Sequence, residues 1–278
     1  MSVAAGSLVR GPRAVPSVPV RRARASDPRK VPTTVSATPA VIVAIDGPSG
    51  TGKSSTSKAV AARLGLSYLD TGAQYRAITW WMLNNGVDTA DADAVAAAAG
   101  KPSIVSGTDP LSPAISADGA DASGPIRTQE VTAAVSAVSA VPEVRERITG
   151  LQRTIAAEAR GGIVVEGRDI GTTVLPDADL KVFLTASPEA RAARRNGELK
   201  TADGTSVGDL AATQQALTAR DRADSSRKTS PLKKADDAVE VDTTELTLEQ
   251  VVECVVTLVE KAAADKEGPA QDREKAAR

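Results

Sequence analysis

VIVAIDGPSGTGKSS, residues 41–55, is the most informative stretch of this chain. Residues 41–46 form a β-branched apolar run, which is typical of a strand buried on both faces of a parallel sheet. Residues 47–54 read Gly-x-x-x-x-Gly-Lys-Ser, and KAVAARL with helical spacing follows from residue 58. Glycines let the backbone N–H groups of such a loop turn inward around a polyphosphate, and the helix N-terminus adds its positive end. The order strand, loop, helix therefore predicts a loop that binds a nucleoside triphosphate.

Two side chains of this loop have specific expected roles. Lys53 is expected to reach the β- and γ-phosphates, and the Ser54 hydroxyl is expected to be a Mg²⁺ ligand. The ATP-binding residues that we predict here are Gly47, Pro48, Ser49, Gly50, Thr51, Gly52, Lys53, Ser54 and Ser55. The loop alone does not separate a kinase from a nucleotide-dependent switch or a motor.

The composition excludes several classes of protein. The 278 residues include no histidine and one cysteine, which excludes Ser–His–Asp hydrolases, His-ligated zinc enzymes, intramolecular disulfides and cysteine-cluster metal sites. The formal net charge of -1 argues against a nucleic-acid-binding protein. No apolar run approaches the roughly 18 residues that a membrane span needs. We therefore expect a soluble, cytoplasmic protein without a membrane partner.

The chain divides into three parts by composition. Residues 1–40 carry seven cationic residues and one anionic residue without any periodic pattern, and we interpret them as a disordered basic extension. A basic arm that contacts anions and a targeting segment are the alternatives for this part. Residues 41–263 are predicted to form one α/β domain, and residues 264–278 a disordered charged tail.

Strands alternate with helices along the domain, which predicts a five-stranded parallel sheet flanked by helices. We expect the strands at 41–46, 66–69, 163–167, 180–185 and 238–242, and helices at 73–83, 127–140, 143–160, 209–222 and 247–263. Short strand-like pieces separated by Gly, Pro and Asp predict a small antiparallel insert at about 100–126. A further helix is expected to open at Pro188 with Ser187 as its N-cap, ahead of a Gly- and Asp-rich loop at 197–208.

Arginines mark a second anion site. Arg76 follows the motif LDTG at the end of a short strand, and Arg168 lies in EGRDIG at the C-terminal end of a buried strand. Ligands of open α/β sheets bind at these strand ends, and a guanidinium fork matches phosphate oxygens. Further candidates are Arg220, Asp224 and Arg227, spaced for one helical face, and the cluster Arg191, Arg194 and Arg195. This pattern predicts a second anion site, which a kinase would need for its acceptor.

The chain resembles the bacterial cytidylate kinases over about residues 41–260. The resemblance rests on IDGPSGTGKSS, LDTGAQYRA, SGPIRTQEV, VVEGRDIGTTVLPDADLKVFL and RDRADSSRKTSPLKKADDAVEVDTT. It implies the P-loop kinase fold, with an NMP-binding insert at about 100–126, a helical connector at 127–160, a helical lid at about 186–222 and core segments at 41–99, 161–185 and 236–263. The implied reaction is transfer of the γ-phosphoryl group of ATP to CMP or dCMP with Mg²⁺, by a monomer.

The resemblance also implies roles for individual residues. Lys53, Arg168 and Arg227 would be catalytic, and Arg191, Arg194 or Arg195 would lie near the ATP phosphates. The CMP site would comprise Thr71, Arg76, Ser136, Arg145, Arg168, Asp169, Arg220, Asp224 and Arg227, with Ser136, Arg145 and Asp169 at the cytosine. Asp70 and Glu166 are candidates for holding metal-bound water.

Two other functions stay open at this point. Another P-loop kinase with a different acceptor would use the same phosphate loop. A GTPase-like switch would need a guanine-reading Asn-Lys-x-Asp motif, which the sequence lacks, and its Asp-x-x-Gly match at 121–124 lies in the expected insert. An acceptor phosphate is mostly a dianion at pH 7 and needs no general base, which is compatible with a chain without histidine.

Overall fold

A computed structural model describes residues 40–198 and 209–267 of this chain. The basic extension 1–39, most of the expected loop at 197–208 and the tail from residue 268 lie outside the described residues. In the part that is described, no helix is long and apolar enough to cross a membrane.

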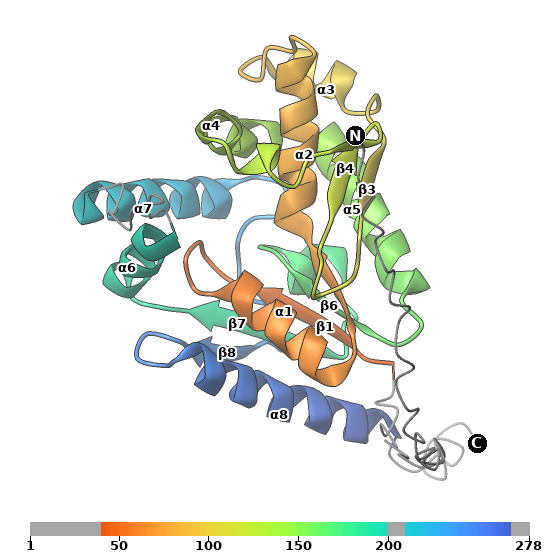
Figure 1. Ribbon diagram of the computed structural model, residues 1–278, viewed down its shortest axis with the longest axis vertical. Coiled ribbons are helices and arrows are strands. Elements are labelled where there is room, and N and C mark those ends of the chain that lie inside the picture. The colour runs from red at the N-terminus through yellow and green to blue at the C-terminus, as the bar shows by residue number, and fades with distance from the viewer. Residues whose placement is uncertain (1–39, 199–208, 268–278) are drawn as a thin grey trace, which may run out of the picture. The chain divides into compact units, whose positions relative to one another are not determined.

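The central sheet has five parallel strands, as the alternation of strands and helices predicted. Their order is β2 (Ser67–Asp70), β6 (Ile163–Glu166), β1 (Ile42–Asp46), β7 (Leu180–Thr185) and β8 (Val239–Asp242) (Figure 1). β1 lies in the middle because its apolar residues can be covered on both faces. All five strands therefore end at the same edge of the sheet, where the phosphate loop begins.

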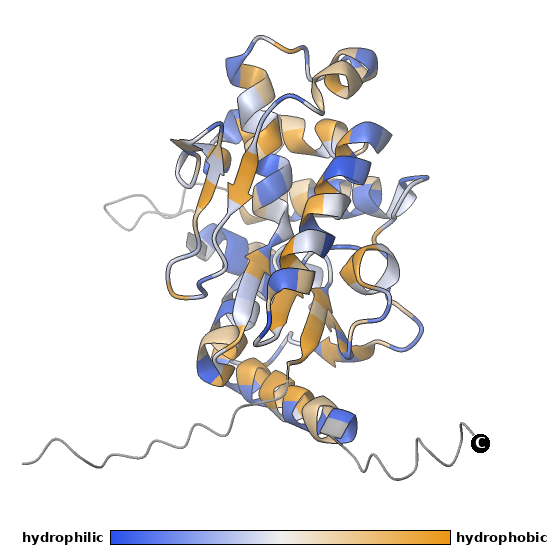
Figure 2. Ribbon diagram, turned by 90° about the vertical axis from the view of Figure 1, so that its right-hand side faces the viewer, coloured by the Kyte–Doolittle hydropathy of each residue, from blue (hydrophilic) through white to orange (hydrophobic). Residues whose placement is uncertain are grey.

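Helices cover both faces of this sheet. α1 (Lys53–Leu64) and α8 (Leu248–Glu267) pack on one face, in a core that includes Val60 and Val255. α5 (Pro142–Glu158) and the π-helical turn Ile170–Val174 pack on the other face through Ala156 and Ile170. Figure 2 shows the apolar residues gathered along the central strands, and polar residues on the outer sides of the helices.

A second apolar core lies around α2 (Thr71–Asn84). It joins this helix to α3 (Ala92–Ala98), α4 (Gln129–Val138), α5 and the short sheet β3 (Ile104–Ser106), β4 (Ile115–Ala117) and β5 (Ala120–Asp121). The three strands pair antiparallel, as expected for the insert at 100–126. Because the shared core includes Ile78 of α2 and Val144 of α5, the insert packs as one piece with the helices on either side of it.

Helix boundaries follow from their capping side chains. α2 begins two residues earlier than expected because the Asp70 side chain accepts a hydrogen bond from Ala73 N at 3.0 Å. The predicted N-cap Ser187 is confirmed: its Oγ accepts from Ala190 N at 3.1 Å at the start of α6 (Pro188–Glu198). Pro142 occupies the first turn of α5, where its missing N–H costs nothing.

Two helices run further than the sequence pattern indicates. α7 (Leu210–Ser226) continues four residues past the expected end at 222. α8 includes residues 264–267, so the expectation that the disordered tail begins at Ala264 is wrong for these four residues. Lys266 Nζ donates to Asp179 Oδ2 at 2.9 Å and to the Ala40 carbonyl at 2.8 Å, which ties the end of this helix to the domain.

Candidate active site

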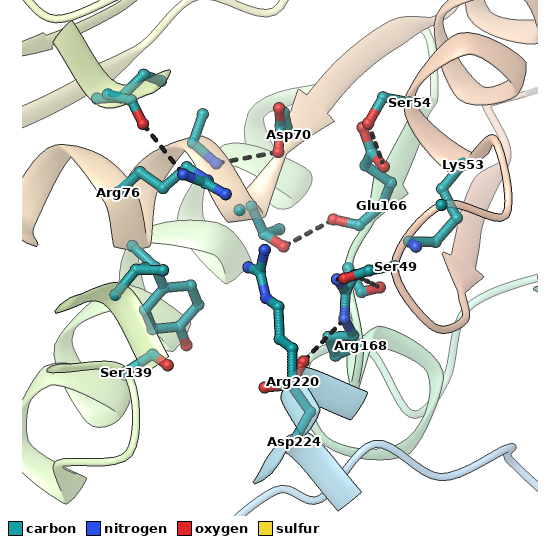
Figure 3. Close-up of a pocket in the computed structure, with 18 of the residues that line it drawn as sticks. Ser49, Lys53, Ser54, Asp70, Arg76, Ser139, Glu166, Arg168, Arg220 and Asp224 are labelled. Carbon is teal, nitrogen blue, oxygen red and sulfur yellow. Dashed lines mark hydrogen bonds and ion pairs between the residues drawn. The ribbon is translucent and has the colours of Figure 1, made fainter. Parts of the chain in front are cut away.

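A cavity of about 530 Å³ opens at the carboxyl end of the sheet (Figure 3). Its walls come from the phosphate loop, the ends of β2 and β6, and helices α1, α2, α4, α5, α6 and α7. Among the described residues, nine cationic side chains and four carboxylates line it. The cations are Lys53, Lys58, Arg76, Arg127, Arg145, Arg168, Arg195, Arg220 and Arg227, and the acids are Asp70, Glu166, Asp169 and Asp224. Such a charge balance favours a polyanionic ligand.

The phosphate loop connects β1 to α1 in the predicted order. Gly52 takes a φ of 86° at the N-cap of α1, a conformation that favours glycine. A Cβ at Gly47 would lie 2.2 Å from the Leu184 carbonyl oxygen, so this position also requires glycine. Ser49, Gly50, Gly52, Lys53, Ser54 and Ser55 line the cavity, whereas Gly47, Pro48 and Thr51 do not.

Lys53 is buried and folds back onto its own loop. Its Nζ donates to the Pro48 carbonyl at 2.6 Å, and Figure 3 shows the side chain beside Ser49. Burial, and next the charge of Arg168, lower the pKa of Lys53 to about 7. A bound phosphate would add negative charge beside this ammonium and favour its charged form.

Ser54 and Glu166 form a small polar network beneath the loop. Ser54 Oγ donates to Glu166 Oε2 at 3.0 Å, and the Tyr68 hydroxyl donates to Glu166 Oε1. Burial, followed by the charge of Asp70, raises the pKa of Glu166 to about 7. Within the described residues, no cluster of three or more His, Cys, Asp or Glu side chains could hold a metal by itself. The donors nevertheless fit Mg²⁺, which takes one or two protein oxygens and completes its shell with water and substrate phosphates.

Predicted arginines from three different elements converge on the cavity. Arg168 Nη2 donates to Ser49 Oγ at 2.7 Å, and its Nε donates to Asp224 Oδ2 at 3.1 Å. Arg76 Nη1 donates to Thr132 Oγ1 at 2.9 Å and to the Ile126 carbonyl at 3.2 Å. Arg227 Nη2 lies 3.7 Å from Asp224 Oδ1. Arg168 therefore reaches both the phosphate loop and α7.

Arg220 is a cation of the cavity with a buried nitrogen atom, Nε, that lacks a hydrogen-bond partner among the described residues. Burial, followed by the charges of Arg168 and Arg76, lowers its pKa to about 10. Figure 3 shows the side chain reaching from α7 into the cavity. A bound anion would give this guanidinium both a counter-charge and a hydrogen-bond acceptor.

The part of the cavity wall formed by Asp169, Arg145 and Tyr75 combines a buried ion pair with an aromatic ring. Asp169 accepts from Arg145 Nη2 at 2.5 Å, and both side chains are buried. The Arg145 guanidinium lies 5.4 Å from the centre of the Tyr75 ring. Thr71 Oγ1 donates to the Glu166 carbonyl at 2.7 Å and also lines the cavity. An aromatic ring beside a buried carboxylate suits a flat base that carries a hydrogen-bond donor.

Some predicted residues do not reach the cavity. Ser136 lies on α4 but does not line it, whereas Ser139, one helical turn later, does. Arg191 is turned toward the backbone of the phosphate loop, and its Nη1 donates to the Ser49 carbonyl at 3.1 Å. Arg194 Nη1 donates to Thr243 Oγ1 at 2.8 Å. Of the three arginines of α6, only Arg195 lines the cavity.

Sequence reasoning missed further residues of the site. Tyr75 lies within the motif LDTGAQYRA, which was the available signal. Asp46 ends β1 and accepts from Ile170 N at 2.9 Å and Gly171 N at 2.7 Å, so it holds the turn that carries Arg168 and Asp169. Burial raises the pKa of Asp46 to about 6. No sequence signal links Asp46 to residues 124 positions away.

Comparisons with known proteins show which family the chain belongs to. The profile of a family described as Cytidylate kinase matches residues 43–261. A protein named Cytidylate kinase from Streptomyces coelicolor (strain ATCC BAA-471 / A3(2) / M145) is 78% identical over 82% of this chain and 96% of its own length. One of the same name from Rhodococcus opacus (strain B4) is 56% identical over 77% of this chain and 93% of its own length. Among solved structures, a gluconokinase from Sinorhizobium meliloti 1021 covers 82% of this chain and 95% of its own, with 14% identity and a TM-score of 0.40, a likeness too distant to bear on function.

Proposed function

The chain belongs to the cytidylate kinase family, and we propose that its cavity holds CMP or dCMP beside ATP, whose γ-phosphoryl group it transfers to the 5′-phosphate of the acceptor. The products are ADP and CDP or dCDP. The observation that carries the proposal is the convergence of Arg76, Arg168 and Arg220 on the space next to the phosphate loop. A second, acceptor phosphate placed there would meet the excess positive charge of the cavity.

The charged and polar side chains that line the cavity indicate where each part of the two nucleotides would bind. The phosphate loop with Lys53 and Ser54 would hold the ATP phosphates, and Arg195 of α6 faces the same space. Arg76, Arg168 and Arg227 would hold the acceptor phosphate, and Arg220 with Asp224 the sugar. Mg²⁺ bound at Ser54, with Glu166 and Asp70 near its water ligands, would neutralise charge on the β- and γ-phosphates.

Catalysis in such a site consists of positioning and charge stabilisation. The acceptor phosphate is mostly a dianion at pH 7, so no residue has to remove a proton from it. The chain's own groups bring two anions together in line and stabilise the negative charge of the moving phosphoryl group. Arg168 is best placed for this because it contacts the phosphate loop at Ser49 and the acceptor side at Asp224. Helices α6 and α7 contribute to the wall of the same space through Arg195 and Leu217.

Base recognition is assigned to Asp169 and Arg145. Cytosine presents an amino donor at the position where uracil presents a carbonyl acceptor. A carboxylate accepts from the amino group and repels the carbonyl, which favours CMP over UMP. Ser139 and Tyr75 complete this part of the cavity wall.

The first experiment measures ADP release by the purified full chain with MgATP and one acceptor at a time. CMP, dCMP, UMP, AMP, GMP, dTMP and shikimate form the panel. We expect turnover dominated by CMP and dCMP. Turnover with another acceptor alone, or none at all, overturns the assignment. We also propose that the protein is a monomer, to be checked by light scattering during gel filtration.

A further inference from the structure

Ser49 of the phosphate loop is held through all of its polar groups. Its N–H donates to Asp221 Oδ1 at 3.1 Å, and its carbonyl accepts from Arg191 Nη1 at 3.1 Å. Its Oγ accepts from Arg168 Nη2 at 2.7 Å. The three partners come from α7, α6 and the turn after β6. One residue of the loop is therefore connected to three separate parts of the domain.

Asp221 and Arg191 also bind each other, and both are largely buried. Their carboxylate and guanidinium form an ion pair with side-chain exposures of 15% and 9%. α6 approaches the loop so closely that a Cβ at Gly50 would lie 3.0 Å from Arg191 Cβ. Neither residue lines the cavity, so the pair does not serve as a substrate contact.

The contacts form a closed ring. Asp221 and Asp224 lie one turn apart on α7, where Asp221 holds the Ser49 backbone and Asp224 holds Arg168. Arg168 returns to the Ser49 side chain, and Figure 3 shows Ser49, Arg168 and Asp224 in line along the edge of the cavity. Moving Ser49 would thus withdraw one of the partners that orient Arg168.

We propose that Asp221 and Arg191 are positioning residues for phosphoryl transfer. They fix the Ser49 peptide between them, and the Ser49 hydroxyl then aims the Arg168 guanidinium at the transferred group. This inference rests on the proposed function, because it assigns Arg168 to the moving phosphoryl group. A misplaced charge-stabilising group lowers the rate more than it weakens substrate binding.

The test is a double-mutant cycle on kcat with Asp221→Asn, Ser49→Ala and the double variant, using MgATP and CMP. Asp221→Asn should lower kcat about 10-fold, with KM for each substrate changing less than about 3-fold. Because both substitutions act through the contact between Ser49 and Arg168, the double variant should fall less than about 3-fold below the lower single variant. Glu189→Gln is the matched control: it alters a contact between α6 and α7, from Gln214 to an exposed Glu189, that does not touch the loop. Its kcat should stay within about 2-fold of wild type.

Three outcomes contradict the proposal. Multiplicative losses in the cycle, an unchanged kcat for Asp221→Asn, or an equal loss for Glu189→Gln would show that the pair serves only the packing of α6 on α7. Thermal unfolding of each variant establishes that it is folded. If Asp221→Asn is unfolded, Arg191→Lys replaces it, since lysine keeps the charge but not the fork. If wild type has no turnover with CMP, the proposed function fails; if it does and the cycle is multiplicative, only this inference fails.

Discussion

Asp169 and Arg145 form a buried ion pair across the acceptor end of the cavity, with Asp169 Oδ2 at 2.5 Å from Arg145 Nη2. Asp169 follows β6 and Arg145 lies on α5, so the pair joins the end of the sheet to a helix of the second core. Arg145 supplies the charge that permits a buried carboxylate, while the second carboxylate oxygen can accept from an amino group. Two roles follow: base recognition by Asp169 itself, or orientation of Arg145 by Asp169.

The first prediction separates these roles. Asp169→Ala should lower the ratio of kcat/KM for CMP to that for UMP by about 10-fold or more, because the acceptor for the cytosine amino group is lost. KM for ATP should change little, since the side chain of Asp169 binds Arg145 of α5 and not a residue of the phosphate loop. Asp177→Ala, an exposed residue of the same connection, is the control. If both pyrimidine nucleotides lose the same factor, Asp169 only orients Arg145.

The second prediction concerns Lys53. Lys53→Ala should abolish phosphoryl transfer because no other side chain of the loop can pair with the β- and γ-phosphates. The melting temperature should not fall, since the substitution removes a buried amine whose pKa is lowered by burial. Lys261→Ala, an exposed lysine of α8, should keep full activity. Turnover retained by the Lys53 variant would remove the phosphate-loop assignment.

The third prediction is that Arg220 lowers the stability of the free protein and strengthens the binding of CMP. Arg220→Met keeps the apolar stem but removes a partly buried cation, whose buried Nε has no partner among the described residues. We expect the free energy of unfolding without ligand to rise by about 1–3 kcal/mol. KM for CMP should rise about 10-fold or more as an anion contact is lost. Arg222→Met, exposed on the same helix, should change neither quantity. A variant that melts lower than wild type would show that Arg220 stabilises the ligand-free fold.

The fourth prediction uses the buried carboxyl of Asp46. Burial raises its pKa from 3.8 to about 6. Between these two pH values the carboxyl of Asp46 is protonated in the folded protein and ionised in the unfolded chain. The contribution of Asp46 to stability therefore falls as the pH rises from about 4 to about 6, by up to about 3 kcal/mol. Asp46→Asn does not titrate, so the difference in unfolding free energy between wild type and variant should change over this range. Urea unfolding of both proteins measures it, and parallel pH profiles would contradict the prediction.

Helix phase and side-chain direction limited the prediction of individual site residues. The expected helix at 127–140 exists as Gln129–Val138, but its packing against α2 turns the Ser139 end toward the cavity and leaves Ser136 outside. Arg191 and Arg195 are one turn apart on α6, yet the first binds the phosphate-loop backbone and the second faces the cavity. Charge and spacing in the sequence indicated the helices on which these residues lie. The packing of each helix against its neighbours decides which of its side chains face the cavity.

The phosphate loop and the five parallel strands could be read from the order of residues, because both depend on local chemistry. Glycines within eight residues set the loop conformation, and β-branched apolar runs that alternate with helices favour a parallel sheet. The acceptor site is different, since Arg76, Arg168 and Arg220 meet only after the chain has folded. The partners of Ser49 come from positions 119 to 172 residues away in the chain. Distances between such residues follow from the packing of α6 and α7 on the sheet, which no local pattern encodes.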